Sequence, residues 1–291
     1  MAAIMESNNS SPYSVETIQA NQDHRWAVLK CSCDPSDEKD ALTNEIVYLV
    51  RKSFGEDKII QTAEDLFVDE LLEGTFNIEH LTNAIRLGLP NPEAEGRKPP
   101  QLTNYRSQTA EMIAKSALAQ AFSFRYPVAP QEATTNPNQP ILGFDGWGVA
   151  EEAQGETTLV LIQVKATDES KYPPGEATKL KSECIRIPFN PSPLSRALVA
   201  MSALLNNSEN MELRKCLLKM LEGIGKQQLP KIYVAPVIVR GVTQSKIEDL
   251  SPIQNAADEF HPAIGRGASV SIGCELAGFG RHVMEHARRS A

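Results

Sequence analysis

The most constraining feature of the sequence is the apolar run TTLVLIQVKAT at residues 157–167. A short run of aliphatic and branched residues, bounded by turn residues, is typical of a buried β-strand. The segment ILGFDGWGV before it has the same character, and EEAQGE between them is typical of a turn. We therefore expect two neighbouring strands, the second of which carries an amide and an ammonium group, at Gln163 and Lys165, within its apolar run.

A helix is predicted immediately before these strands, in YRSQTAEMIAKSALAQAFSF at residues 105–124. Its apolar residues recur every three or four positions, as they do along the buried side of an amphipathic helix. Glu111 lies beside this apolar stripe. The positions that define the stripe are Ala110, Ile113, Ala114, Leu118 and Phe122.

The rest of the chain predicts alternating helices and strands. Residues 171–188 are rich in proline and lysine and are expected to form a loop. Its basic residues Lys171, Lys179, Lys181 and Arg186 are explained equally well as phosphate contacts and as solvated surface charge. This order predicts an α/β (α+β) fold with a mixed central sheet flanked by helices. Helices are expected at 193–206, 211–223, 251–260 and 279–289, and strands at 231–241 and 268–276.

Charge is distributed unevenly along the 291 residues, whose formal net charge is −8. Residues 1–100 carry 9 Lys and Arg against 18 Asp and Glu, whereas residues 101–291 carry 20 against 19. We accordingly predict a flexible terminus at 1–20, an acidic α+β unit at 21–90, a linker at 91–104 and a second domain at 105–291. Within the acidic unit we expect a strand at 25–33 and helices at 40–54 and 77–89.

Composition excludes several classes of protein. No apolar run approaches the length of a membrane-spanning helix, and the N-terminus lacks the basic start and apolar core of a signal peptide, which predicts a cytoplasmic protein. The five cysteines are odd in number and scattered, which disfavours a disulfide framework. The sequence has no phosphate-binding loop of the form G-x-x-x-x-G-K-[ST], so ATP hydrolysis is not expected of it.

Four residues form a candidate site. Gln163 and Lys165 are two positions apart and project from one face of their strand, and Asp145 begins the neighbouring strand. Carboxylate and amide oxygens are suitable ligands for Mg²⁺ or Mn²⁺, and a nearby ammonium stabilises charge on a phosphate. We expect Asp145, Gln163 and Glu111 to bind the cation and Lys165 to face the scissile phosphate.

This set resembles the PD-(D/E)XK nuclease superfamily, whose core carries D…(D/E/Q)xK on paired strands after a helix. The match consists of Glu111, Asp145 in GFDG, and Gln163-Val164-Lys165 in LIQVK. Glutamine replaces the commoner acid, as in the QxK form of Mrr-like restriction nucleases. Since an amide contributes no charge, this replacement affects the expected affinity for metal.

The layout is closer still to the DUF1837 family, which includes the nuclease subunit of the Hachiman antiphage systems. The similarity lies in the acidic N-terminal unit, the helix containing residues 106–114, and the segment 143–165. It implies a Mg²⁺-dependent endonuclease acting on DNA in antiphage defence, with a helicase-like ATPase as its partner.

Other interpretations stay open. Lys165 could be a solvated residue at the end of a strand, and Glu111 an ordinary surface acid. The chain could be a catalytically silent binding or assembly module, or an Mrr-like nuclease without a helicase partner. His282 and His286 lie four positions apart on the predicted last helix, but a solvated helix face explains them better than a metal site does.

Overall fold

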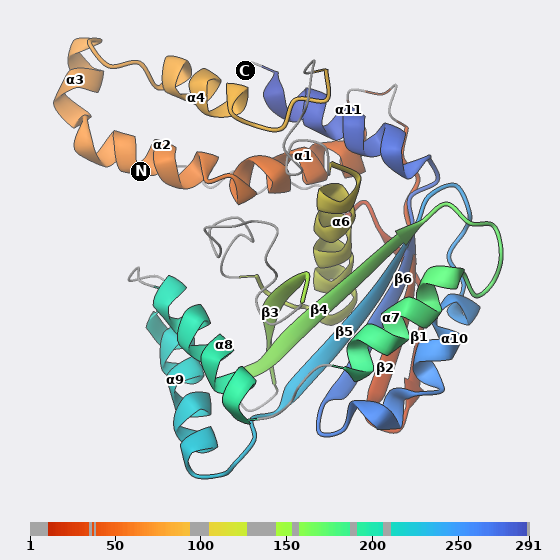
Figure 1. Cartoon of the computed structure of the whole chain (residues 1–291). Helices are drawn as coiled ribbons and strands as arrows, with labels where there is room; N and C mark the ends of the chain where they lie inside the picture. Colours follow the sequence, from red (N-terminus) through yellow and green to blue (C-terminus); the bar gives the residue numbers. More distant parts are fainter. Residues whose placement is uncertain are drawn as a thin grey trace.

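A computed structural model describes residues 11–34, 37, 39–93, 105–126, 144–152, 157–186, 191–205 and 211–289. The strands of this part of the chain form one six-stranded mixed sheet (Figure 1). Its order is β1-β2-β6-β5-β4-β3, in which the two outermost pairs are antiparallel and the three inner pairs are parallel. The strands are β1 Ser14–Asn21, β2 His24–Lys30, β3 Gly146–Glu151, β4 Thr157–Thr167, β5 Ile232–Arg240 and β6 Ile264–Ser271.

Helices cover both faces of the sheet (Figure 1). One face packs against α1, α6 and α11, and the other against α7, α10 and the α8–α9 hairpin. Short 3₁₀ turns, Ile247–Leu250 and Ala257–Phe260, flank α10. The helices are α1 Ala41–Ser53, α2 Glu56–Leu66, α3 Val68–Glu73, α4 Ile78–Leu87, α6 Tyr105–Phe122, α7 Gly175–Ile185, α8 Pro191–Leu204, α9 Met211–Gly225, α10 Ser251–Gln254 and α11 Leu276–Arg288.

The apolar run at residues 157–167 is strand β4, with β5 on one side and β3 on the other. Successive side chains of a strand point to opposite faces. Ile162 and Val164 accordingly lie in the core beneath α6, whereas Leu159 and Leu161 lie in the core beneath α7. Gln163 and Lys165 share the side of the strand that faces α7.

The predicted mixed sheet flanked by helices is confirmed. The helix expected at 105–124 is α6, the two expected strands are β3 and β4, and the last helix is α11. The helix expected at 251–260 is a series of short helical turns instead. Of the predicted linker at 91–104, residues 94–104 lie outside the described residues, as do residues 1–10 of the predicted flexible terminus.

Two local predictions are wrong. Residues 14–20, predicted to be flexible, belong to β1, which pairs with β2. Most of the predicted loop at 171–188 is helix α7, because Ala177, Leu180 and Cys184 are buried at helical spacing.

The sheet also crosses the predicted boundary between an N-terminal unit and a nuclease-like domain. Strand β2 pairs in parallel with β6, near the other end of the chain, and α1 shares one core with α6 and α11. A difference in charge composition therefore does not mark a division of the core.

Strand β6 begins four residues earlier than predicted. The sequence pattern missed these residues because two glycines lie among them. A side chain at Gly265 or Gly267 would collide with the buried indole of Trp26, whose ring atoms would lie 2.8 and 2.7 Å from the added Cβ. The glycines thus serve close packing against β2, although glycine weakens strands in general.

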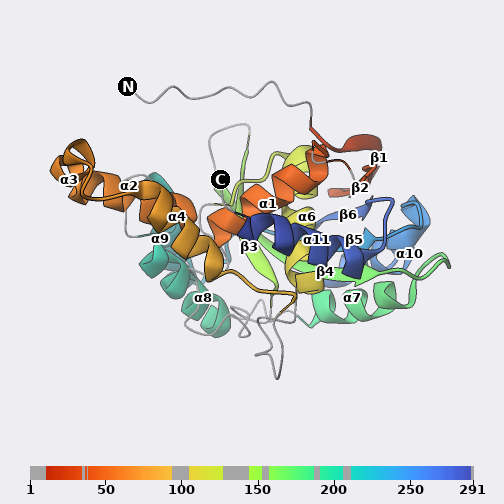
Figure 2. The same cartoon turned by 90° about the horizontal axis from the view of Figure 1, so that it is seen from above.

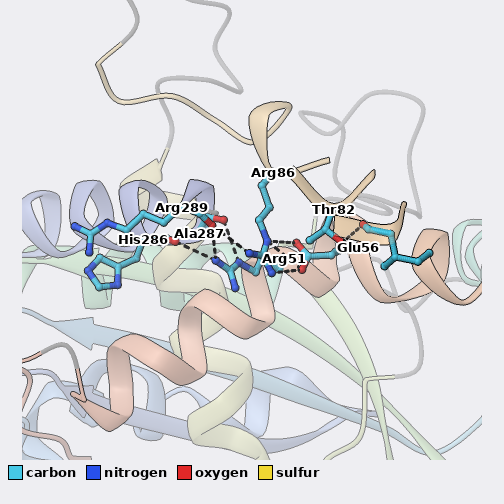
Figure 3. Close-up of polar contacts among 8 residues, drawn as sticks. Arg51, Glu56, Thr82, Arg86, His286, Ala287 and Arg289 are labelled. Atoms are coloured by element: carbon cyan, nitrogen blue, oxygen red, sulfur yellow. Dashed lines mark hydrogen bonds and ion pairs between the residues drawn. The ribbon is translucent and has the colours of Figure 1, made fainter. Parts of the chain in front are cut away.

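Helices α2, α3 and α4 form an arm that extends away from the sheet (Figure 2). Its base is fixed to the C-terminus of α11 by two arginines (Figure 3). Arg86 forms a buried ion pair with Glu56 at 2.8 Å, and its Nη1 donates to the carbonyl of Arg289 at 3.2 Å. Arg51 donates to the carbonyls of His286 and Ala287 at 3.1 and 3.0 Å. Both guanidinium groups thereby donate to carbonyl groups in the last turn and at the C-cap of α11, where the helix supplies few donors of its own.

Across the described segments, every helix is too short or too polar to span a bilayer. The five cysteines are all free thiols, as their odd number and spacing predicted.

Candidate active site

Asp145 lies where β3 and β4 stop pairing. The regular register of the two strands begins at Gly146 and Ile162. One residue earlier, the backbone N–H of Asp145 still donates to the carbonyl of Ile162 at 3.1 Å, while its Oδ2 accepts from the N–H of Val164 at 2.7 Å. The carboxylate thus takes the position of a strand carbonyl, which holds it in the gap between the strands.

Gln163 and Lys165 meet a third residue, Glu183, on α7. The Gln163 Nε2 donates to Glu183 Oε2 at 2.9 Å, and the Lys165 Nζ lies 2.8 Å from Glu183 Oε1. The Gln163 side chain is buried, and the Lys165 side chain is 25% exposed. One carboxylate therefore fixes the amide of Gln163 and neutralises the ammonium group of Lys165.

Glu111 approaches from α6, which covers the other face of the sheet. Burial raises the pKa of Glu111 to about 7, and the negative charge of Asp145 adds to this rise, while the nearby ammonium group of Lys115 opposes it. A carboxyl group with this pKa exchanges its proton near neutral pH, as general acids and bases do.

Lys115 is the second lysine of the site. Its side chain is buried one helical turn after Glu111, and burial lowers its pKa while Glu111 and Asp145 oppose the change. Gly146 provides the space for it, because a Cβ on Gly146 would lie 2.9 Å from Lys115 Cε.

Asp145 interacts both with residues on β4 and with residues on α6. Burial raises its pKa, and the N–H of Val164, Lys165 and Lys115 oppose that rise. The carboxylate of Asp145 thus interacts electrostatically with a lysine on α6 and with a lysine on β4. A half-buried carboxylate with two lysines nearby is a common setting for functional chemistry, although structural networks also produce it.

The structure places the four residues predicted from the sequence in two groups rather than in one cluster. Asp145, Gln163 and Lys165 lie together at the β3–β4 gap and the α7 face. Glu111 interacts with Asp145 but lies on the helix that covers the opposite face of β4.

Two residues of the site were not predicted. Lys115 could have been noticed because it lies four positions after Glu111, and so on the same side of the helix. Glu183 was missed because its segment was interpreted as a loop. The buried stripe Ala177, Leu180 and Cys184 was the available signal for a helix.

Two of the four basic residues predicted to meet phosphates are paired with acids. Lys171 lies 3.3 Å from Glu169, and Lys179 lies 2.6 Å from Glu176. Such exposed pairs contribute little to stability and open readily when an anion competes. They therefore leave the prediction of phosphate contacts untested.

The donor atoms of the site, carboxylate and amide oxygens, are of the type that binds a hard cation. Mg²⁺ in proteins is commonly bound by one or two carboxylates, with water and substrate phosphates completing the shell. Asp145 offers a carboxylate whose hydrogen bond engages only Oδ2, and Gln163 offers an amide whose Nε2 is the atom bound to Glu183. In the part of the chain that the structure covers, no group of three or more His, Cys, Asp or Glu side chains is placed to hold a metal ion. Asp145 and Gln163 therefore fit a cation that takes some of its remaining ligands from the substrate phosphates.

Comparison with known proteins adds no family to this geometry. No protein-family model matches the sequence, and a search of the curated proteins finds no match.

Proposed function

We propose that this protein is a metal-dependent nuclease that hydrolyses phosphodiester bonds, with DNA as its substrate. The observation that carries the proposal is the position of the Asp145 carboxylate, which lies in the β3–β4 gap within electrostatic reach of Lys165 and Lys115. The resemblance to D…QxK nucleases, stated from the sequence, supports the same chemistry.

Each side chain has a distinct part in this proposal. Lys165 stabilises negative charge that develops on the phosphate, because a fixed ammonium group in a partly buried site acts strongly there. Glu183 holds Gln163 and Lys165 in place in the free protein and must release Lys165 when a phosphate arrives. Glu111 can take up or release a proton near neutral pH.

Asp145 and Gln163 are the residues that would hold Mg²⁺ or Mn²⁺, with Glu111 as a further carboxylate. When bound, the cation would supply Lewis-acid stabilisation of the phosphate. Burial of Glu111 favours its protonated form, so its part in metal binding requires deprotonation.

The biological setting follows from the resemblance alone. We propose a cytoplasmic effector nuclease of a prokaryotic antiphage system, regulated by a helicase-like ATPase. The acidic N-terminal third would repel a DNA duplex, which favours a partner that delivers the substrate.

A second candidate function is a silent binding or assembly module built on the same fold. The observation in its favour is the ion pair between Lys165 and Glu183, which neutralises the lysine inside the protein. The module requires no metal and no proton transfer at the site.

Cleavage assays distinguish the two functions. Purified wild-type protein is incubated with duplex DNA, single-stranded DNA or RNA, in Mg²⁺, Mn²⁺ or EDTA. We expect metal-dependent cleavage that falls at least ~100-fold in Asp145→Asn and in Lys165→Met, as is typical when a group that stabilises the transition state is lost.

The matched control is Lys226→Met, which removes an exposed lysine that directly follows α9 and is paired with Glu222. This variant should cleave as the wild type does. Circular dichroism checks that every variant is folded. Cleavage at equal rates by the wild type and both site variants, or by none of them in any metal, would favour the binding module.

A further inference from the structure

The arm formed by α2, α3 and α4 ends in a tip that contacts little of the protein. Figures 1 and 2 both place α3 at the end farthest from the sheet. Helix α3 buries none of its residues, and α2 buries only Glu56 and Ala63. The residues 57–79 are called the arm tip below.

Large apolar side chains are exposed on this arm tip. Leu72 is 83% exposed and Leu66 is 70% exposed, and Val68 and Ile59 are exposed as well. Ile59 and Leu66 lie seven positions apart, and Val68 and Leu72 lie four apart, so each pair occupies one side of its helix. Exposed apolar side chains that recur along one side of a helix mark interaction surfaces more often than single exposed residues do.

The arm tip is held in a defined shape. The rings of Phe67 and Phe76 stack with centroids 4.4 Å apart, and the backbone N–H groups of Thr75 and Phe76 both donate to the carbonyl of Glu70. At the base, the buried Arg86–Glu56 pair fixes α2 to α4 (Figure 3). A surface that is already ordered loses less conformational entropy on binding.

The charge of the arm tip limits what can bind to it. One lysine, Lys58, lies among its exposed acids. Nucleic acid and anionic membranes carry the same sign of charge as these acids and are repelled. A second copy of the chain, with a net charge of −8, is also disfavoured. The exposed acids are Asp57, Glu64, Asp65, Asp69, Glu70, Glu73 and Glu79.

We propose that the arm tip is a docking surface for a different protein, which presents an apolar groove surrounded by basic residues. The apolar side chains provide the buried centre of such an interface, and the surrounding acids steer the basic partner and set its orientation. The proposal concerns residues outside the candidate active site and does not depend on hydrolysis.

Site-specific photo-crosslinking in cells of the source organism identifies the partner. A benzoylphenylalanine is placed at Leu72 and, as a matched control, at Val199, an exposed apolar residue of α8. A protein crosslinked through Leu72 only is then purified, and its binding to the full-length chain is measured by calorimetry at low and high salt.

We expect Leu66→Asp and Leu72→Asp each to weaken binding at least ~10-fold, as loss of an apolar anchor does. Charge reversal by Glu70→Lys should slow association, and salt should weaken binding to the wild type. Val199→Asp should bind as the wild type does. Circular dichroism of the free variants checks the fold, which exposed positions should leave intact.

Several outcomes overturn the proposal. These are no crosslink through Leu72, equal crosslinking through Val199, and a purified partner that binds both leucine variants as tightly as the wild type. Sedimentation of the chain alone tests the second copy: self-association that Leu72→Asp abolishes assigns the surface to a homodimer. Binding to phosphatidylglycerol vesicles that depends on Leu72 assigns it to a membrane.

Discussion

The buried ion pair at the base of the arm gives a sharp prediction about stability. Arg86 donates through Nε to both oxygens of Glu56, at 3.2 and 3.1 Å, and through Nη2 at 2.8 Å. The two side chains are 9% and 8% exposed. Replacing Arg86 with methionine keeps the apolar stem and removes the charge.

The expected loss follows from the partners that remain. Removing one member of a buried ion pair costs ~3–5 kcal/mol, because the other charge is left buried. Arg51 is still close enough to Glu56 to interact with it electrostatically, which offsets part of this cost. We therefore expect Arg86→Met to lower the free energy of unfolding by about 3 kcal/mol near neutral pH.

Urea unfolding followed by far-ultraviolet circular dichroism measures this loss. The double variant Arg86→Met/Glu56→Gln should be more stable than the sum of the two single losses predicts. The exposed-lysine variant Lys226→Met serves as the control and should leave the midpoint unchanged.

A loss under about 1 kcal/mol together with additive effects in the double variant would contradict a buried Arg86–Glu56 pair, because buried pairs couple strongly. That result would mean that the arm base is hydrated in solution.

Three further predictions concern other parts of the chain. Gly267→Ala should lower the free energy of unfolding by ~1–3 kcal/mol, because the new methyl group meets the Trp26 ring; an unchanged urea midpoint would contradict this packing. His24 accepts a hydrogen bond from the Gly265 N–H at 2.8 Å, and burial lowers its pKa, so protein stability should be full above pH ~6.5 and fall below it. Urea unfolding at several pH values measures this, and a slope that persists in His24→Gln would assign the effect to other groups. Gln163→Glu should destabilise the metal-free protein, because the new carboxylate faces that of Glu183 on α7, and it should tighten the Mg²⁺ binding measured by calorimetry. Complete loss of Mg²⁺ binding would remove Gln163 from the ligand set.

The sequence predicted the elements whose pattern is long and regular. Strand β4 and helix α6 were recognised because an apolar run and a helical stripe are local signals. The same signals placed Asp145, Gln163 and Lys165 on adjoining strands, and the structure brings these three together.

What the sequence could not supply is pairing between distant segments. All residues of β1 are exposed, so the strand lacks the apolar alternation that marks a half-buried strand. The pairing of β2 with β6 joins opposite ends of the chain, and no local pattern encodes it. For the same reason Glu183 could not be placed beside Lys165 without the helix that carries it.

The position of β2 has a consequence for how the chain is made. Its neighbours in the sheet are β1 and β6, and Lys30 pairs with Ser271, which a ribosome adds long after it has made β2. Until then, the β1–β2 hairpin has an open edge beside Trp26 and Leu29, and an isolated hairpin is barely stable in water. Nascent or truncated chains that stop before β6 therefore present an unpaired apolar strand to chaperones, proteases and one another.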